Sequence, residues 1–439
     1  MDTPICDFVR GYVREDPLRL HMPGHKGGGT LGIEHLDLTE VEGADSLYEA
    51  GGIIRQSEEN ASALFGCPTF YSTEGSSQCI RAMLYLAMVH SGSRRVLAAR
   101  NVHKTFLSAA AMLDLDVQWL WPRQTDSYLS CVLDAPDVER ALKGAGEKPA
   151  AVYLTSPDYL GSVTDIGAVA EVCRKHGVLL LVDNAHGAYL RFLQPSRHPM
   201  DLGADLCCDS AHKTLPVLTG GAYLHIAAPG LAARAKDALA LFGSTSPSYL
   251  ILQSLDAANA GLSGGYSRIL AEFVRRVAGL REALNRHGCS LRGQEPLKIT
   301  IAAKPWGYTG RQLADVLLER NIVCEFSDPD YLVMMLTPET GAEGLRRLEE
   351  VLLSIPKRPA ITEKPPRFHP CEQVLSIREA IFSPSETVPV SESTGRILAA
   401  PSVGCPPAVP IAVCGERLDE AAAACFRYYG IGQCTVIKY

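Results

Sequence analysis

The chain has 439 residues, of which 46% are hydrophobic and 21% charged; this length and composition predict a globular protein of about two or three domains. Its 42 Lys and Arg against 49 Asp and Glu give a formal net charge of −7, which argues against a dedicated nucleic-acid-binding protein. The longest apolar runs, 178–182 and 331–336, are far shorter than the roughly 18 residues of a membrane span. The N-terminus is charged throughout and has no apolar signal-peptide core. We therefore expect a cytoplasmic protein that binds neither membranes nor nucleic acids.

The chain contains 14 cysteines, at irregular spacings and without a CxxC pair. Reduced and mostly buried thiols are the expected state of such cysteines inside the cell. The sequence therefore predicts neither a disulfide framework nor a metal site.

The first 55 residues are rich in Gly, His and charged side chains, and they predict an irregular N-terminal arm. From about Ser57 onward, apolar strand-like runs alternate with stretches of helical periodicity. The amphipathic stretch 166–177, for example, predicts a helix that stops at Gly177. Runs that are apolar at every position are typical of a mostly parallel sheet with helices on both faces. The predicted strands are 96–100, 117–121, 151–155, 178–183, 204–210 and 222–226.

A long helical stretch, about 249–287, follows this α/β part. A smaller unit comes next, with predicted strands at 297–303 and 323–337 and predicted helices at 309–321 and 341–354. The Lys- and Pro-rich segment 357–370 predicts a linker. The predicted parts are an N-terminal arm (1–55), a large α/β domain (56–290), a small α/β domain (291–356) and a C-terminal domain (357–439).

Lys213 follows the predicted strand 204–210, within the segment DSAHKTLPVLTGG. A lone lysine is usually a solvated surface residue. Earlier in the chain, however, Asp183 ends the most apolar run. Ligands of open α/β sheets bind outside the carboxyl ends of the strands, so we expect both side chains to point into one crevice.

Two further features accompany this lysine and aspartate. Gly75, Ser76 and Ser77 follow a short strand and begin an apolar helix, where backbone N–H groups, hydroxyls and the helix dipole can hold a phosphate. His103 comes just after another predicted strand, and its ring can stack on an aromatic cofactor. Pyridoxal phosphate requires such a set, because a lysine forms the Schiff base and a carboxylate keeps the pyridine nitrogen protonated. The sequence therefore predicts a pyridoxal-phosphate enzyme.

Several segments resemble one family of such enzymes almost end to end. They include HMPGHKGG (21–28), DNAHGA (183–188), SAHKTLPVLTG (210–220) and STSPSY (244–249). With them the chain resembles the Orn/Lys/Arg decarboxylases of fold type I, in a short bacterial form without an N-terminal wing domain. The resemblance implies a three-layer α/β/α large domain, a smaller α/β domain and a small C-terminal domain.

The resemblance also implies roles for single residues. Lys213 would be the Schiff-base lysine, Asp183 the pyridinium partner and His103 the stacking base. Thr245 and Ser246 would reach the phosphate of a partner subunit, which implies a homodimer with shared active sites; larger assemblies are compatible with it. The other implied cofactor contacts are Gly75, Ser76, Ser77, His186, Ser210 and His212.

Three positions depart from the family pattern. Glu74 stands where we expect an Asn, and a carboxylate beside a phosphate is repulsive unless it is paired or points away. Asn184 stands where the family usually has an acidic residue. The segment CPPAVP (405–410) replaces one similar to Tyr-Pro-Pro-Gly-Ile-Pro, which lies near the substrate entrance in relatives. The last departure bears on substrate identity.

The implied reaction is decarboxylation of a basic amino acid, arginine or lysine before ornithine, to a polyamine-type amine and CO₂. The cationic end of this substrate needs an acidic partner, and Glu325, Asp330 and Glu416 are the candidates, although each is equally well explained as a solvated loop carboxylate. Three alternatives stay open: an aminotransferase or carbon–sulfur lyase, a non-standard substrate, and a non-catalytic regulatory protein that binds pyridoxal phosphate. An aminotransferase normally uses an arginine of the small domain to bind the α-carboxylate, but Arg311 and Arg320 fall on the predicted helix.

Overall fold

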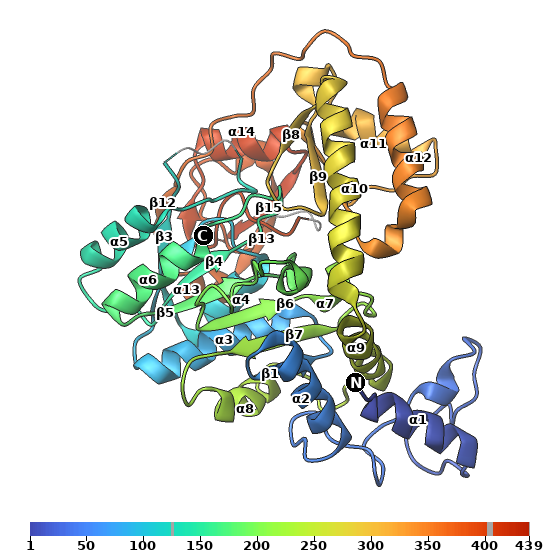
Figure 1. Ribbon diagram of the computed structural model, residues 1–439. Helices are drawn as coiled ribbons and strands as arrows, with labels where there is room; N and C mark the ends of the chain where they lie inside the picture. The colour runs from blue at the N-terminus through green and yellow to red at the C-terminus, as the bar shows by residue number, and fades with distance from the viewer. Residues whose placement is uncertain (124–126, 402–406, 439) are drawn as a thin grey trace. The chain divides into compact units, whose positions relative to one another are not determined.

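The computed structural model describes residues 1–123, 127–401 and 407–438 (Figure 1). The chain forms two compact units, each with strands of a seven-stranded sheet. The first unit is Met1–Gly92 with Leu179–Ala271, and the second is Ser93–Val178 with Glu272–Tyr439. The fold is mixed α/β, as the sequence predicts. The proposed division into four parts stays a prediction.

The first unit holds four strands in the order β1-β7-β6-β5. β5 and β6 are parallel, whereas β7 is antiparallel to both of its neighbours. Nearly all residues of β5, β6 and β7 are buried, which explains their continuous apolar sequences. The elements are α1 (Pro4–Glu15), α2 (Ile53–Phe65), β1 (Thr69–Ser72), α3 (Ser76–Ser91), β5 (Leu179–Asp183), β6 (Leu206–Asp209), α7 (Ala211–Thr214), β7 (Ala222–Ile226), α8 (Ala235–Ala240) and α9 (Tyr249–Ser263), with 3₁₀ helices at Glu34–Leu36, Ala188–Phe192 and Ala232–Arg234.

The predicted irregular arm is wrong for its first residues, because α1 is a regular helix. Its side chains Ile5, Cys6 and Val9 are buried. The backbone N–H groups of Ile5 and Cys6, which have no acceptor within the helix, donate to the carboxylate of Asp256 in α9, at 3.0 Å each. A carboxylate far along the chain therefore caps this helix, and a local sequence pattern does not show such a cap.

The predicted helix 249–287 is two helices, α9 and α10 (Tyr266–Arg286). Gly264 and Gly265 lie between them, and Gly265 has a φ of +100°, a conformation that favours glycine. The glycine pair thus separates two helices whose periodicity suggested one. α10 begins in the first unit and continues into the second.

The second unit holds the parallel strands β4-β2-β3 and a four-stranded antiparallel sheet in the order β10-β11-β9-β8. Helix α6 ends before Gly177, as predicted. Helix α11 is shorter than predicted, so Arg320 lies beyond its end at Leu318. The other elements are β2 (Arg95–Ala99), α4 (Lys104–Leu113), β3 (Asp116–Leu120), α5 (Ala135–Gly144), β4 (Ala151–Thr155), α6 (Ile166–His176), β8 (Ser290–Arg292), β9 (Lys298–Ala302), α11 (Gly310–Leu318), β10 (Phe326–Ser327), β11 (Tyr331–Met335), α12 (Gly341–Ser354), β12 (Glu372–Gln373), α13 (Ile377–Phe382), β13 (Ser385–Pro389), β14 (Glu416–Arg417), α14 (Glu420–Tyr428) and β15 (Gln433–Ile437), with 3₁₀ helices at Lys304–Trp306, Pro338–Thr340 and Val390–Glu392.

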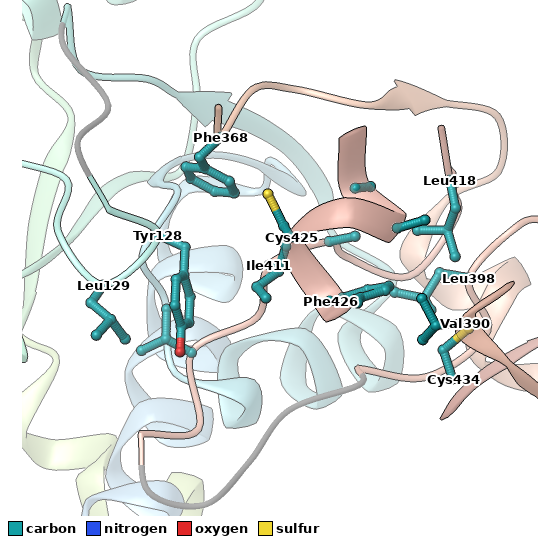
Figure 2. Close-up of a cluster of buried hydrophobic side chains, with 14 of the residues drawn as sticks. Tyr128, Leu129, Phe368, Val390, Leu398, Ile411, Leu418, Cys425, Phe426 and Cys434 are labelled. Atoms are coloured by element: carbon teal, nitrogen blue, oxygen red, sulfur yellow. The ribbon is translucent and has the colours of Figure 1, made fainter. Parts of the chain in front are cut away.

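An apolar cluster in the second unit joins the C-terminal residues to the loop after β3 (Figure 2). Phe426 of α14 and Leu398 are completely buried in it, and Tyr128 of the loop belongs to the same cluster. Residues 357–370 contain no helix or strand, as predicted for a linker. The linker is nevertheless held at its end, because Phe368 is part of the cluster.

The structure bears on the predictions about the cysteines and about membrane spans. The cysteines in the described ranges are free thiols, and most of them are buried. None of the helices in the described ranges has both the length and the apolar character that a membrane crossing needs.

Candidate functional site

The lysine singled out by the sequence lies just beyond β6 in the first unit. β6 ends at Asp209, and Lys213 lies on the one-turn helix α7 that follows. Its Nζ is 3.2 Å from His186 Nε2, and its backbone N–H donates to Ser210 O at 3.0 Å. An amine and an imidazole at this distance can exchange a proton. The structure thus brings together two residues that the sequence predicts for one site.

The residues predicted to bind a phosphate lie at the start of α3. Gly75 precedes the helix with a φ of +72°, and no side chain caps the helix there. Ser210 Oγ donates to Ser76 Oγ at 2.8 Å, so the turn before Lys213 meets the first residue of α3. Ser77 is the next residue of this 16-residue helix. Hydroxyls at the positive end of a helix dipole suit a phosphate anion.

Asp183 is the last residue of β5 and is 2% exposed. Its Oδ1 accepts a hydrogen bond from the backbone N–H of Ala185 at 3.1 Å and lies 3.7 Å from Cys208 Sγ. β5 and β6 pair Asp183 with Cys208, so the predicted strand-end position is confirmed. Its role toward a pyridine nitrogen stays a prediction.

His212 lies beside Lys213 on α7. Its Nδ1 is 3.0 Å from the carbonyl of Gly221, and because a carbonyl only accepts, Nδ1 carries the proton. Burial and then the neighbouring charge of Lys213 lower the pKa of His212. The ring is therefore neutral near pH 7, and its Nε2 is an acceptor.

Glu74, which departs from the family pattern, is paired. Its Oε1 accepts the backbone N–H of Ser244 at 2.5 Å. Ser244 Oγ in turn accepts the backbone N–H of Ser246 at 3.1 Å, which organises the segment that carries Thr245 and Ser246. These two side chains are exposed in the chain, and their contact with a partner subunit stays a prediction.

His103 belongs to the second unit, where it is the N-cap of α4. Its Nδ1 accepts the backbone N–H of Thr105 at 3.2 Å. The cap fixes the orientation of the half-buried ring, and its stacking role stays a prediction.

The three candidate substrate carboxylates have different partners in the second unit. Glu416 forms an ion pair with Arg100 at 3.3 Å, with both side chains almost completely buried. Asp330 forms one with Lys304 at 3.0 Å. Glu325 is exposed, accepts the hydroxyl of Tyr159 at 2.8 Å, and forms no ion pair within the described ranges. The charge of two candidates is therefore already balanced by a buried cation.

Arg100 is a residue that sequence analysis missed. Its guanidinium donates to the carbonyls of Pro410 and Ile411 at 3.1 and 3.0 Å. The backbone N–H of Lys104 donates to Ala408 O at 2.8 Å. These bonds attach the described part of the segment 405–410 to the loop that carries His103; Cys405 and Pro406 lie outside the described residues.

A second missed group surrounds Asp209, where both His198 and His225 approach its carboxylate. His198, Cys207 and Asp209 place ligand-type atoms within 4.8 Å of one another. The histidine Nε2 atoms lie 3.0 and 3.1 Å from Asp209 Oδ2, as in hydrogen bonds, so we interpret the group as a hydrogen-bonded cluster. Its sequence signal is a single charged residue at the end of an apolar run.

The sequence was compared with protein families and with known proteins. Residues 3–302 match the family described as "Orn/Lys/Arg decarboxylase, major domain", and residues 371–435 match its C-terminal domain. An arginine decarboxylase of Bacillus subtilis is 28% identical, over 95% of this chain and 92% of its own length. One of Halalkalibacterium halodurans is also 28% identical, over 97% and 93%.

Solved structures show a similar fold. A lysine decarboxylase of Francisella novicida has a TM-score of 0.82 at 18% identity and covers 99% of this chain and 79% of its own. The constitutive lysine decarboxylase of E. coli has a TM-score of 0.79 at 18% identity, covering 100% and 82%. The predicted fold class, with a large α/β domain of fold type I and a small C-terminal domain, is confirmed.

Proposed function

Because the chain belongs to the Orn/Lys/Arg decarboxylase family, we propose that it decarboxylates a basic amino acid, with pyridoxal phosphate as its cofactor. Family membership makes it an amino-acid decarboxylase. The names of the full-length relatives favour arginine, before lysine and ornithine. The product would be the corresponding polyamine-type amine, released with CO₂. The observation that carries the proposal is that a lysine, an imidazole and serine hydroxyls lie together at the ends of β5 and β6 and the start of α3.

The residues of the first unit fit the cofactor. Ser76 and Ser210, which share a hydrogen bond at the start of α3, offer hydroxyls to a phosphate. The buried carboxylate of Asp183 would hold a proton at a pyridine nitrogen. Lys213 Nζ would hold the cofactor covalently, and His186 Nε2 is close enough to take a proton from it. Bound pyridoxal phosphate would supply the electron sink that decarboxylation requires.

For the cationic end of the substrate, we propose Glu325. Asp330 and Glu416 already face buried cations, and a carboxylate in such a pair is poorly placed to bind a second cation. Glu325 has a hydroxyl donor instead of a cation. Its negative charge is therefore the one still available for a guanidinium or ammonium group.

The proposed assembly is a homodimer in which Thr245 and Ser246 of one subunit reach the cofactor phosphate of the other. Its proposed compartment is the cytoplasm. The exposure of both side chains and the organised segment that carries them support this part of the proposal. Free buried cysteines support a reducing compartment. Stacking of His103 on the cofactor ring completes the proposed site.

The test is CO₂ release by the purified, pyridoxal-phosphate-loaded protein with arginine, lysine, ornithine, and acidic and aromatic amino acids. We expect release with one basic amino acid and a loss of at least about 10³-fold in Lys213→Ala. Circular dichroism of the variant should match the parent. Turnover retained by Lys213→Ala would overturn the proposal. Cofactor uptake at Lys213 without release from any amino acid would favour a non-catalytic protein or a non-standard substrate.

A further inference from the structure

Asp209 is a completely buried carboxylate with donors at both oxygens. Oδ2 accepts from His198 Nε2 at 3.0 Å and from His225 Nε2 at 3.1 Å. Oδ1 accepts from Asn184 Nδ2 at 2.7 Å. All four side chains have no solvent exposure. A buried charge is tolerated only where such donors replace its lost hydration, so the cluster works as a unit.

The electrostatics keep the negative charge on Asp209. Burial acts to raise the pKa of Asp209, but His198 and His225 outweigh it, and the pKa lies below its ordinary value. Burial lowers the pKa of His225, so its ring is neutral near pH 7. The neutral ring donates from Nε2, and its Nδ1 lies 2.9 Å from Thr69 Oγ1.

The cluster lies on the opposite face of β6 from the candidate cofactor residue Asp183. Cys208 Sγ contacts Asp183, whereas the side chain of Asp209 projects from the other face of β6, because side chains alternate along a strand. Asn184 follows Asp183 directly, and its backbone N–H donates to Cys208 O at 3.0 Å. The Asn184–Asp209 hydrogen bond therefore ties the end of β5 to the end of β6. It does so next to Asp183 and one turn before Lys213.

We propose that Asp209 is a positioning residue, which through Asn184 fixes the strand end with Asp183 relative to the one with Lys213 and so sets how tightly pyridoxal phosphate is held. This inference rests on the proposed cofactor site. Asn184 stands where the family usually has an acidic residue, and here the charge of the pair is on β6. Acids at both positions would place two carboxylates within hydrogen-bond distance, and one of them would have to bind a proton.

The experiment measures the affinity of the full-length chain for pyridoxal phosphate, by titrating the visible absorbance band of the bound cofactor without substrate. Asp209→Asn removes the negative charge and replaces one acceptor oxygen by an N–H donor, whereas in Asn184→Asp two carboxylates meet. We expect each single variant to lose at least about tenfold in affinity and to change the absorbance band. The double variant N184D/D209N restores one carboxylate opposite one amide, and we expect it within about threefold of the parent.

Asp256→Asn is the matched control, because Asp256 is another buried carboxylate of the same unit but accepts N–H groups from α1. We expect it to lower the unfolding midpoint and to leave cofactor affinity within about twofold. This control separates positioning of the cofactor residues from a general loss of stability.

The outcomes decide the inference separately from the proposed function. Parent-like affinity in Asp209→Asn, or a double variant no better than the single ones, would overturn the positioning role. Stoichiometric zinc in the purified parent would also overturn it, because the metal would replace the hydrogen bonds. If Asp209→Asn does not fold, Asn184→Asp decides, since it keeps Asp209 and both histidines. A parent that takes up no pyridoxal phosphate would overturn the proposed function as well.

Discussion

Asp209 of the first unit and two buried carboxylates of the second unit differ in the kind of partner that each one has. In the first unit, Asp209 is surrounded by uncharged and imidazole N–H donors. In the second unit, Glu416 and Asp330 each face a buried cation, Arg100 and Lys304. A carboxylate with several N–H donors can hold two strand ends in register, whereas an ion pair consumes the charge that a substrate would need. The comparison teaches that the partners of an acidic residue, more than its position in a motif, indicate what it can do.

After the loss of Lys213, the largest expected effect comes from removing the acid proposed for the cofactor ring. Asp183→Ala should lower decarboxylation by about 10²-fold or more at saturating cofactor, because a pyridine nitrogen without a proton is a poor electron sink. CO₂ release from the preferred basic amino acid measures this. Asp201→Asn is the control, since Asp201 pairs with Arg191 in the same unit. Turnover of Asp183→Ala equal to that of the parent would contradict the role of Asp183 at the pyridine nitrogen.

The next effect tests the ion pair of the second unit. Glu416→Ala leaves Arg100 buried without its counter-charge and should lower the free energy of unfolding by about 3 kcal/mol, measured by urea denaturation. Glu372→Ala is the control: its pair with Arg417 is exposed, and its loss should cost about 0.5 kcal/mol or less. A raised KM for the basic amino acid at unchanged stability would instead make Glu416 the substrate partner.

In the first unit the sequence predicts the strand ends better than the contacts between distant parts of the chain, for physical reasons. Lys213 and Asp183 follow apolar runs, and a strand end is recognisable from local sequence alone. The donors of Asp209 come from a loop and from another strand, so no local pattern announces them. The cap of α1 by Asp256 was missed for the same reason.

The substrate side shows the limit more clearly. Glu325, Asp330 and Glu416 are all acids near short apolar runs, and their sequences do not distinguish them. The difference arises from Arg100 and Lys304, which the fold places beside two of them. Pairing across long stretches of chain is a tertiary property, so the choice among the three required the structure.

A pH series sharpens the contrast between ionised and neutral buried acids. Burial, opposed in part by Lys298, raises the pKa of Glu295 to about 7. Folding thus favours the protonated form of Glu295. The contribution of this form to the stability of the chain is complete below the ordinary pKa of a glutamate and is lost as the pH rises through about 7. Glu295→Gln does not ionise, so relative to the parent it should gain on the order of 2 kcal/mol between pH 5 and pH 8. Urea denaturation across that range measures it, and a difference independent of pH would contradict the argument.

A smaller effect is expected at the proposed substrate carboxylate. Glu325→Gln should raise the KM for the basic amino acid by about tenfold and leave kcat nearly unchanged, because the lost charge acts on binding. Steady-state CO₂ release measures both constants. Glu350→Gln, which removes an exposed partner of Arg346, is the control. An unchanged KM in Glu325→Gln would contradict the assignment of Glu325 to the cationic end of the substrate.

The smallest effect concerns Ala408, which has a φ of +58° where the family motif has Gly. This conformation costs an alanine about 1 kcal/mol, but a glycine loses more entropy on folding, so Ala408→Gly should stabilise the chain by only about 0.5 kcal/mol. Ala412→Gly is the matched control, because Ala412 is equally buried and has no positive φ; it should destabilise by about 1 kcal/mol. If urea denaturation shows that Ala408→Gly raises the free energy of unfolding and Ala412→Gly lowers it, the backbone at Ala408 is strained. Destabilisation in both variants would mean that packing of the Ala408 methyl outweighs the strain. The alanine at this position would then stabilise the contact between the loop of His103 and the segment that Arg100 binds.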